Sequence, residues 1–190
     1  MKIAIRQPQA IYELGQRDNQ EDSIWPLQGQ ATDQDFFFIL CDGMGGHAGG
    51  DTASTIAIRS LAHIEQDNVQ GDVQIIAHMM ETSVMAAHDA IVGKAKRERK
   101  LAGMGTTMTA VALVAGYWVL AHIGDSRIYL YRDDALTQIT TDHTFVQRLV
   151  DSGRITPEEA RYHPRRSVLM RVLGDMDPDP EIDTFIMPRS

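Results

Sequence analysis

A run of apolar residues that ends in an acidic, glycine-rich segment constrains the fold more than any other feature of this sequence. The run is Phe36-Phe37-Phe38-Ile39-Leu40-Cys41, and Asp42-Gly43-Met44-Gly45-Gly46 follows it directly. Its length and composition predict a buried strand. A carboxylate at the end of a buried strand is costly unless it is paired or binds a cation, and the glycines behind it let the backbone approach a ligand closely. The segment is therefore a candidate ligand site.

Acidic residues elsewhere complete a plausible metal site. The segment Arg17-Asp18-Asn19-Gln20-Glu21-Asp22 precedes the apolar run, and Asp125 follows a second one at Tyr117–Ile123. Clustered carboxylates without thiolates suit Mg²⁺ or Mn²⁺ rather than zinc. Two such ions could lower the pKa of a shared water and orient it for in-line attack on phosphorus. Arg17 could hold the phosphate oxygens bidentately, so we predict a site made of Arg17, Glu21, Asp22, Asp42 and Asp125.

Each motif alone also has a simpler interpretation. An Asp-Gly pair after a strand is usually a turn, and the Arg17–Asp22 segment could be solvated surface. Residues 43–48 also satisfy the G-x-G-x-x-A fingerprint of dinucleotide-binding proteins. A second predicted helix, rather than a parallel strand, follows the first one, and Asp42 would face the pyrophosphate. Both observations count against a nucleotide site without removing that alternative.

Composition limits the class of protein. The 190 residues fit one domain, and a net charge of -8 argues against a nucleic-acid partner. A basic cluster at the end of a predicted helix is expected to complement that helix's last turn; its members are Lys94, Lys96, Arg97, Arg99 and Lys100. A single cysteine, Cys41, favours the cytoplasm. The longest apolar stretch, Ala110–Ala121, is too short to span a membrane, so no membrane partner is expected.

The order of predicted elements indicates an α+β fold. Strands are expected at Lys2–Arg6, Asp35–Cys41, Thr107–Ala115, Tyr117–Ile123, Arg127–Arg132 and Leu136–Thr140. Helices are expected from about Asp51, after an Asp72 N-cap, over Thr144–Asp151 and from Thr156-Pro157. Several strands are continuously apolar, which predicts cover on both faces. Paired helices followed by consecutive strands favour antiparallel sheets inside and helices outside.

The motifs occur in an order that resembles the metal-dependent protein serine/threonine phosphatases of the PP2C type, also called the PPM family. The matching segments are Arg17–Asp22, Asp42–Gly46, Gly105-Thr106-Thr107 and Gly124-Asp125-Ser126-Arg127. Asp142-His143 and Val150–Gly174 resemble the mobile flap of bacterial members. The resemblance implies one domain over residues 1–190, with a flap at about 143–174. Its expected fold is a four-layer α-β-β-α sandwich of two antiparallel sheets flanked by helices.

The resemblance also implies a mechanism. Two Mn²⁺ or Mg²⁺ ions, and a looser third ion, would activate water to hydrolyse phosphoserine and phosphothreonine without a phosphoenzyme. Asp42 would bridge two ions, and the Gly43 carbonyl would bind the first. Glu21 and Asp22 would act around the waters of the ions, Asp125 would hold the third ion, and Arg17 would bind the substrate phosphate. The expected partners are phosphorylated proteins, opposing a serine/threonine kinase.

Two departures from the family pattern matter. Met44 stands where some eukaryotic relatives carry a histidine proposed as general acid, and His47 does not inherit that place, so leaving-group protonation is unassigned. The later Asp-Gly-Leu and Asp-Asn motifs that supply further metal ligands in the family have no counterpart here: the sequence holds no Asp-Gly-Leu or Asp-Asn-x-Thr pattern, and Asp67-Asn68 is expected to be a turn between two helices. The domain is therefore expected to be C-terminally incomplete. The alternative function is an inactive PP2C-like domain that binds a phosphoprotein or a partner without turnover.

Overall fold

The structure is a computed structural model that describes residues 7–32, 36–45, 49–66, 72–114, 116–174 and 180–189. Its strands are β1 (Asp22–Trp25), β2 (Phe37–Met44), β3 (Gly105–Thr106), β4 (Met108–Val114), β5 (Tyr117–Ile123), β6 (Tyr129–Arg132), β7 (Ala135–Gln138) and β8 (Asp183–Pro188). Its helices are α1 (Gly49–Gln66), α2 (Val73–Arg97), α3 (Phe145–Asp151) and α4 (Pro157–Tyr162), with the 3-10 turn η1 (Arg99–Leu101).

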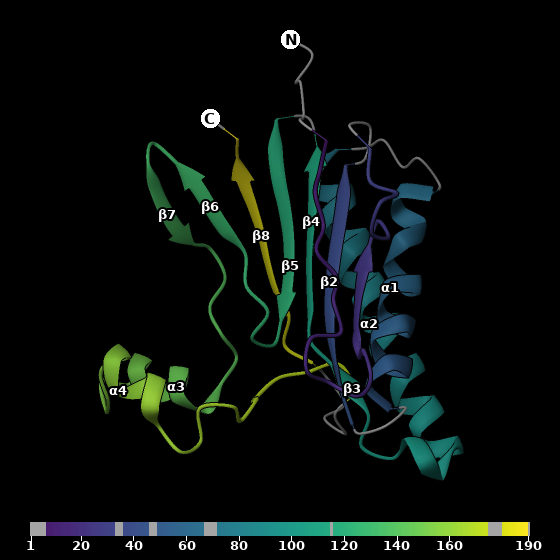
Figure 1. The fold of residues 1–190 in the computed structure, drawn as a ribbon. Helices are drawn as coiled ribbons and strands as arrows, with labels where there is room; N and C mark the ends of the chain where they lie inside the picture. Colours follow the sequence, from purple (N-terminus) through teal and green to yellow (C-terminus); the bar gives the residue numbers. More distant parts are fainter. Residues whose placement is uncertain are drawn as a thin grey trace.

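One antiparallel sheet carries the core. Its strand order is β1-β2-β4-β5-β8, and β3 pairs with β2. Helices α1 and α2 lie side by side against one face of this sheet (Figure 1). Asp72 caps α2 by accepting a hydrogen bond from Gln74 N at 2.9 Å. The stripe predicted for this helix packs into the core through Ile76, Met80, Val84, Ala87 and Ile91.

Strand β2 shows how the two faces of the sheet differ. Phe37, Ile39 and Cys41 are buried against the helices, whereas Leu40 on the opposite face is 44% exposed. The sequence analysis predicted that continuously apolar strands would be buried on both faces of the sheet. For β2 that prediction was wrong, because one face of this strand is exposed. It holds for β5, where Val119 and Leu120 are both buried. Asp42 and Met44 follow the pattern of Leu40 and lie on the open face.

The C-terminal half adds a hairpin and two short helices. Strands β6 and β7 form a separate two-stranded sheet. They turn through Asp133 and Asp134, both at positive φ, as tight hairpin turns require. Thr144 caps α3, and Thr156 forms a capping box with Glu159 ahead of Pro157 in α4. Figure 1 shows α3 and α4 set away from the main sheet, where the flap is expected.

The predicted α+β class of antiparallel sheets and helices is confirmed. The predicted strand Lys2–Arg6 lies outside the described residues. Strand β1 was not predicted, because four residues give little periodicity, and β2 continues through Asp42-Gly43 rather than turning there. All strand pairs within the described ranges are antiparallel. The dinucleotide alternative needs parallel strands joined by a helix, so it was wrong. None of the helices described is long and apolar enough to span a membrane.

Candidate active site

Two aspartates face each other across β1 and β2. Asp22 and Asp42 are directly opposite in the antiparallel register, so their side chains share one face of the sheet. Burial, the negative charges of Asp22 and Asp125, and a hydrogen bond with Asp22 raise the pKa of Asp42 to about 6, while the Arg17 guanidinium acts in the opposite direction. The structure thus brings four of the predicted residues together, and their mutual repulsion favours a bound cation.

The backbone around Asp42 is held by hydrogen bonds and close packing. Asp42 N donates to Thr107 Oγ1 at 3.0 Å, and Thr107 N donates to Asp42 O at 2.9 Å. Gly43 N donates to Glu21 O at 3.1 Å. A Cβ atom on Gly43 would lie 2.2 Å from Gly50 O, so only glycine fits between β2 and the start of α1. The glycine after Asp42 is therefore required by the approach of a helix, in addition to any ligand.

Glu21 lies against the first turn of α1. A Cβ atom on Gly50 would come within 2.9 Å of Glu21 Oε1, which places this carboxylate beside the helix N-terminus. Ser54 Oγ in the same helix donates to Glu21 O at 2.7 Å. The positive end of a helix dipole stabilises a nearby carboxylate. Glu21 is thus held at the same edge of the sheet as Asp22 and Gly43, through contacts of its own.

Asp125 belongs to the loop after β5. Burial and the negative charge of Asp142 raise the pKa of Asp125. Thr107 connects this loop to Asp42, because its Oγ1 lies 2.8 Å from Ser126 Oγ while it accepts from Asp42 N. Gly124 has φ of +109°, and a Cβ atom there would meet Thr107 Cγ2 at 2.5 Å. The two acidic loops are therefore coupled through one threonine.

The carboxylates fit an open site for a divalent cation. Among the residues that the structure describes, no three aspartate, glutamate, histidine or cysteine side chains are arranged to hold a metal ion. The donors present are oxygen ligands, with Asp22 and Asp42 as the facing pair. Mg²⁺ and Mn²⁺ prefer such ligands, and Mg²⁺ usually keeps several waters. The set therefore fits Mn²⁺ or Mg²⁺ in chemistry, with coordination positions left for water.

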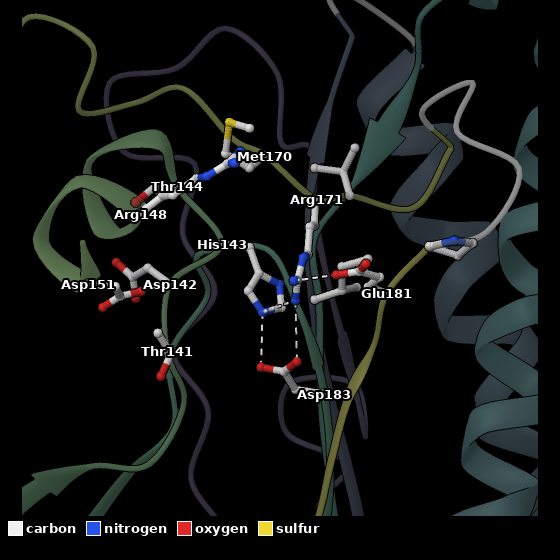
Figure 2. A pocket seen from close by; sticks show the side chains of 13 residues that line it. Thr141, Asp142, His143, Thr144, Arg148, Asp151, Met170, Arg171, Glu181 and Asp183 are labelled. Carbon is white, nitrogen blue, oxygen red and sulfur yellow. Dashed lines mark hydrogen bonds and ion pairs between the residues drawn. The ribbon is translucent and has the colours of Figure 1, made fainter.

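A cavity of about 830 Å³ lies between β8 and the flap segment, the name used here for residues 143–174, which the sequence predicts to be a flap; His143 is at the centre of the cavity (Figure 2). His143 Nδ1 accepts a hydrogen bond from Gly124 N at 3.1 Å, so Nε2 carries the proton and donates to Asp183 Oδ2 at 3.0 Å. Arg171 contacts Asp183 at 3.5 Å and forms an ion pair with Glu181. The start of the flap segment, at His143, is therefore tied both to β8 and to the loop that carries Asp125.

This network was not predicted. The Asp142-His143 pair drew attention only through its resemblance to the flap, and Asp183 stood beside a short apolar segment with no motif. Asp142 instead binds Arg127, accepting from its Nε at 2.7 Å and from its Nη2. Hydrogen bonds to Asp142 raise the pKa of the Arg127 guanidinium. Contacts between residues this far apart in sequence leave no local pattern that could have predicted them.

Comparison with known proteins identifies the family. Residues 16–160 match protein phosphatase 2C. This range covers most of the chain, and the protein belongs to the protein phosphatase 2C family. The resemblance predicted from the motifs is thereby confirmed, and with it the layered α+β class.

Individual relatives are bacterial. The chain is 46% identical over 166 residues to the serine/threonine protein phosphatase PstP of Mycobacterium tuberculosis, covering 87% of this chain and 30% of that protein. It is 38% identical over 151 residues to the serine/threonine phosphatase stp of Listeria innocua, covering 79% of this chain and 60% of that protein. A solved PstP catalytic domain in complex with 2 manganese ions superposes with a TM-score of 0.74 at 41% identity, covering 96% of this chain and 70% of that one.

Proposed function

We propose that this protein is a metal-dependent protein serine/threonine phosphatase that hydrolyses phosphoserine and phosphothreonine monoesters. The observation that carries the proposal is the facing pair Asp22 and Asp42, with Asp125 and Arg17 within electrostatic reach of Asp42. Family membership and the manganese-containing relative support the same chemistry. The chain spans only part of its curated relatives, so activity is proposed here for these 190 residues.

Each side chain has a proposed task. When bound, two Mn²⁺ or Mg²⁺ ions supply Lewis-acid activation of water for attack on phosphorus. Asp42 and Asp22 would hold the ions, with the Gly43 carbonyl and Glu21 contributing as the family pattern implies. Asp125 would serve a third ion. Arg17 would orient the phosphate, since its planar guanidinium can bind two phosphate oxygens at once.

The expected substrates are phosphorylated proteins, in opposition to a serine/threonine kinase. The proposed location is the cytoplasm, where a reduced, buried Cys41 is ordinary. No nucleic-acid or membrane partner is proposed. Helices α3 and α4 lie away from the main sheet (Figure 1), and the cavity around His143 is lined by Arg148 and Asp151 of α3. This position leaves room for a protein substrate.

Hydrolysis of p-nitrophenyl phosphate and of a phosphothreonine peptide, each with Mn²⁺ and with a chelator, tests this proposal. We expect turnover only with Mn²⁺, and none for Asp42→Asn. Arg17→Ala should raise KM about tenfold or more because it removes a charge-assisted phosphate contact, whereas Arg17→Lys should raise it less. Arg59→Ala, on the exposed face of α1, is the control of equal charge change. Turnover in chelator, or full turnover by Asp42→Asn, would contradict the proposal.

The alternative of binding without turnover has its own signature. A domain of that kind would bind the phosphothreonine peptide with an affinity that depends on Arg17, and would release no phosphate at any Mn²⁺ concentration. Fluorescence anisotropy of the labelled peptide, together with a phosphate-release assay on the same sample, separates the two functions.

A further inference from the structure

A second groove lies next to the proposed active site and has a different character from the cavity at His143. It has a volume of about 440 Å³ and runs between the end of α2, the loop before β3 and the returning end of the flap segment. Its lining is mainly apolar, with Met44, Val92, Ala95, Met104, Leu169 and Val172. Every ionisable side chain that lines it is cationic: Lys96, Arg99 and Arg171.

Met44 places one end of this groove beside the carboxylates. Asp42 and Met44 are two residues apart on β2, so both side chains stand on the open face of the sheet, about 7 Å apart along the strand. Met44 is 39% exposed. An extended peptide advances about 3.3 Å per residue. A phosphoresidue at Asp42 would therefore place its second or third neighbour at Met44.

The groove is formed by fixed backbone. Thr106 and Leu173 exchange two hydrogen bonds of 2.9 Å, N to O in each direction, which fastens the end of the flap segment to β3. Gly174 N donates to His88 Nδ1 at 3.3 Å. A Cβ atom on Gly174 would lie 2.4 Å from Ile91 Cγ2. A groove already closed on these sides loses little entropy when a peptide binds in it.

The groove is lined by cationic side chains although the molecule as a whole is negatively charged. The chain has a net charge of -8. Arg171 is engaged by Glu181 and Asp183, whereas Lys96 and Arg99 form no ion pair within the described ranges. Lys94 and Lys100, in the same basic cluster, both contact Glu98. Arg97 of this cluster also has no ion pair within the described ranges, but it does not line the groove. Lys96 and Arg99 therefore face the groove as cations without a carboxylate partner among the described residues, a role beyond complementing the end of a helix.

We propose that this groove docks the residues flanking the phosphoresidue of a protein substrate, and that it selects segments with acidic and apolar side chains. The inference rests on the proposed function. The apolar floor would receive aliphatic side chains, and Lys96 and Arg99 would attract carboxylates at the rim. The negative charge of the molecule as a whole disfavours long polyanions such as nucleic acids, so a short peptide with local acidity fits better.

The test compares two double variants of equal charge change. Lys96→Glu with Arg99→Glu reverses the rim, while Arg97→Glu with Lys100→Glu reverses two neighbouring cations that do not line the groove. Two labelled phosphothreonine peptides are used, flanked either by Glu and Leu or by Lys and Ser. Their affinity is measured by anisotropy with chelator present, and their kcat/KM by phosphate release with Mn²⁺. p-Nitrophenyl phosphate reports the active site alone, and circular dichroism reports folding.

We expect the wild-type protein to prefer the acidic peptide, and the groove variant to bind it about tenfold more weakly, a change of about 1.4 kcal/mol. The control variant should lose about twofold or less, and all three proteins should hydrolyse p-nitrophenyl phosphate equally. Equal losses in the two variants, or no loss in either, would overturn the proposal. So would tighter binding of a single-stranded oligonucleotide through the same two residues. If the wild-type protein hydrolyses nothing, the proposed function fails, while the anisotropy data still decide whether the groove docks the peptide.

Discussion

Replacing Asp42 by asparagine should change the stability of this protein in opposite directions with and without Mn²⁺. In the metal-free protein, burial and the charges of Asp22 and Asp125 raise the pKa of Asp42 from 3.8 to about 6. A carboxyl group whose pKa is higher in the folded protein holds its proton more tightly when folded. Its ionisation therefore destabilises the fold, and the penalty grows as pH rises through the interval between these two values. Above that interval the penalty is complete.

The size of this penalty follows from the same values. The difference from 3.8 to about 6 is roughly two pKa units, and each unit corresponds to about 1.4 kcal/mol. Because Asp42 lies on the exposed face of β2, solvent screens much of this energy, and we expect about 1 kcal/mol. For a chain of this length, that free energy corresponds to an increase in Tm of about 2–4 °C. Metal-free Asp42→Asn should show this increase at about pH 7.5, and none below the lower pKa.

With Mn²⁺ present, the wild-type protein should instead have a higher Tm than Asp42→Asn. A ligand present at 100 times its Kd stabilises the folded state by about 2.7 kcal/mol, and Asp42→Asn should lose most of this gain because it loses a charged ligand. Thermal melts followed by circular dichroism, in chelator and in Mn²⁺, measure both effects. Asp89→Asn, on the exposed surface of α2, is the matched control and should resemble wild type. A lower Tm for Asp42→Asn in chelator would refute the reasoning, as would equal stabilisation of both proteins by Mn²⁺.

Three further substitutions test the supports of the site. Gly43→Ala should destabilise the protein by about 1–3 kcal/mol in urea titrations because its Cβ meets the backbone of α1, whereas Gly93→Ala within α2 should be neutral or stabilising by up to about 1 kcal/mol. Thr107→Val should cost about 1–3 kcal/mol by leaving the N–H of Asp42 unpaired, and Thr107→Ser should restore most of it; equal stability of the two variants would contradict this. His122 of β5 is buried, with its ring centroid 4.8 Å from that of His143. Burial, followed by the nearby His143, lowers the pKa of His122, so the contribution of His122 to stability is complete above the unfolded value of 6.5 and is lost as pH falls below it. His122→Gln should therefore show a flatter decline in unfolding free energy between about pH 7 and 5 than wild type does.

The sequence predicts the long, periodic elements of this fold well. Helices α1 and α2 and strands β4 and β5 were all predicted, since each carries a full apolar stripe or run. The cap at Asp72 and the helix start at Thr156-Pro157 were predicted from local chemistry, and the structure shows both. The capping box between Thr156 and Glu159 was not predicted. Strand β1 escaped prediction because its four residues gain their structure from pairing with β2. Pairing of that kind is a property of the whole sheet and leaves no local signal.

The same distinction applies to the site. The carboxylates were predicted because an acid next to an apolar run is unusual, and the structure places Asp22 and Asp125 within electrostatic reach of Asp42. The role of each carboxylate as a metal ligand stays a prediction. The expectation that the two-sheet sandwich is incomplete at its C-terminal end also stays a prediction. Tertiary pairing alone creates the ties from His143 to Asp183 and from Thr107 to Ser126. A motif can therefore predict which groups do chemistry, but it cannot predict what holds them.

The hydrogen bonds that fix the backbone of Asp42 explain how the proposed site can select a substrate by the residues that flank its phosphoresidue. The backbone of Asp42 is fixed by Thr107, and the strand then continues to Met44 instead of turning away. This continuation carries the open face of the sheet from the carboxylates to the apolar groove without a flexible link. Thr106, the residue beside Thr107, fastens the far wall of the groove through Leu173. Thr106 makes this contact through its backbone, while its Oγ1 donates to Asp42 O at 3.0 Å. The side chains of both threonines thus hold the backbone of Asp42 at a fixed distance from the groove, so a substitution that removes either hydroxyl should change the preference between peptides as well as the rate.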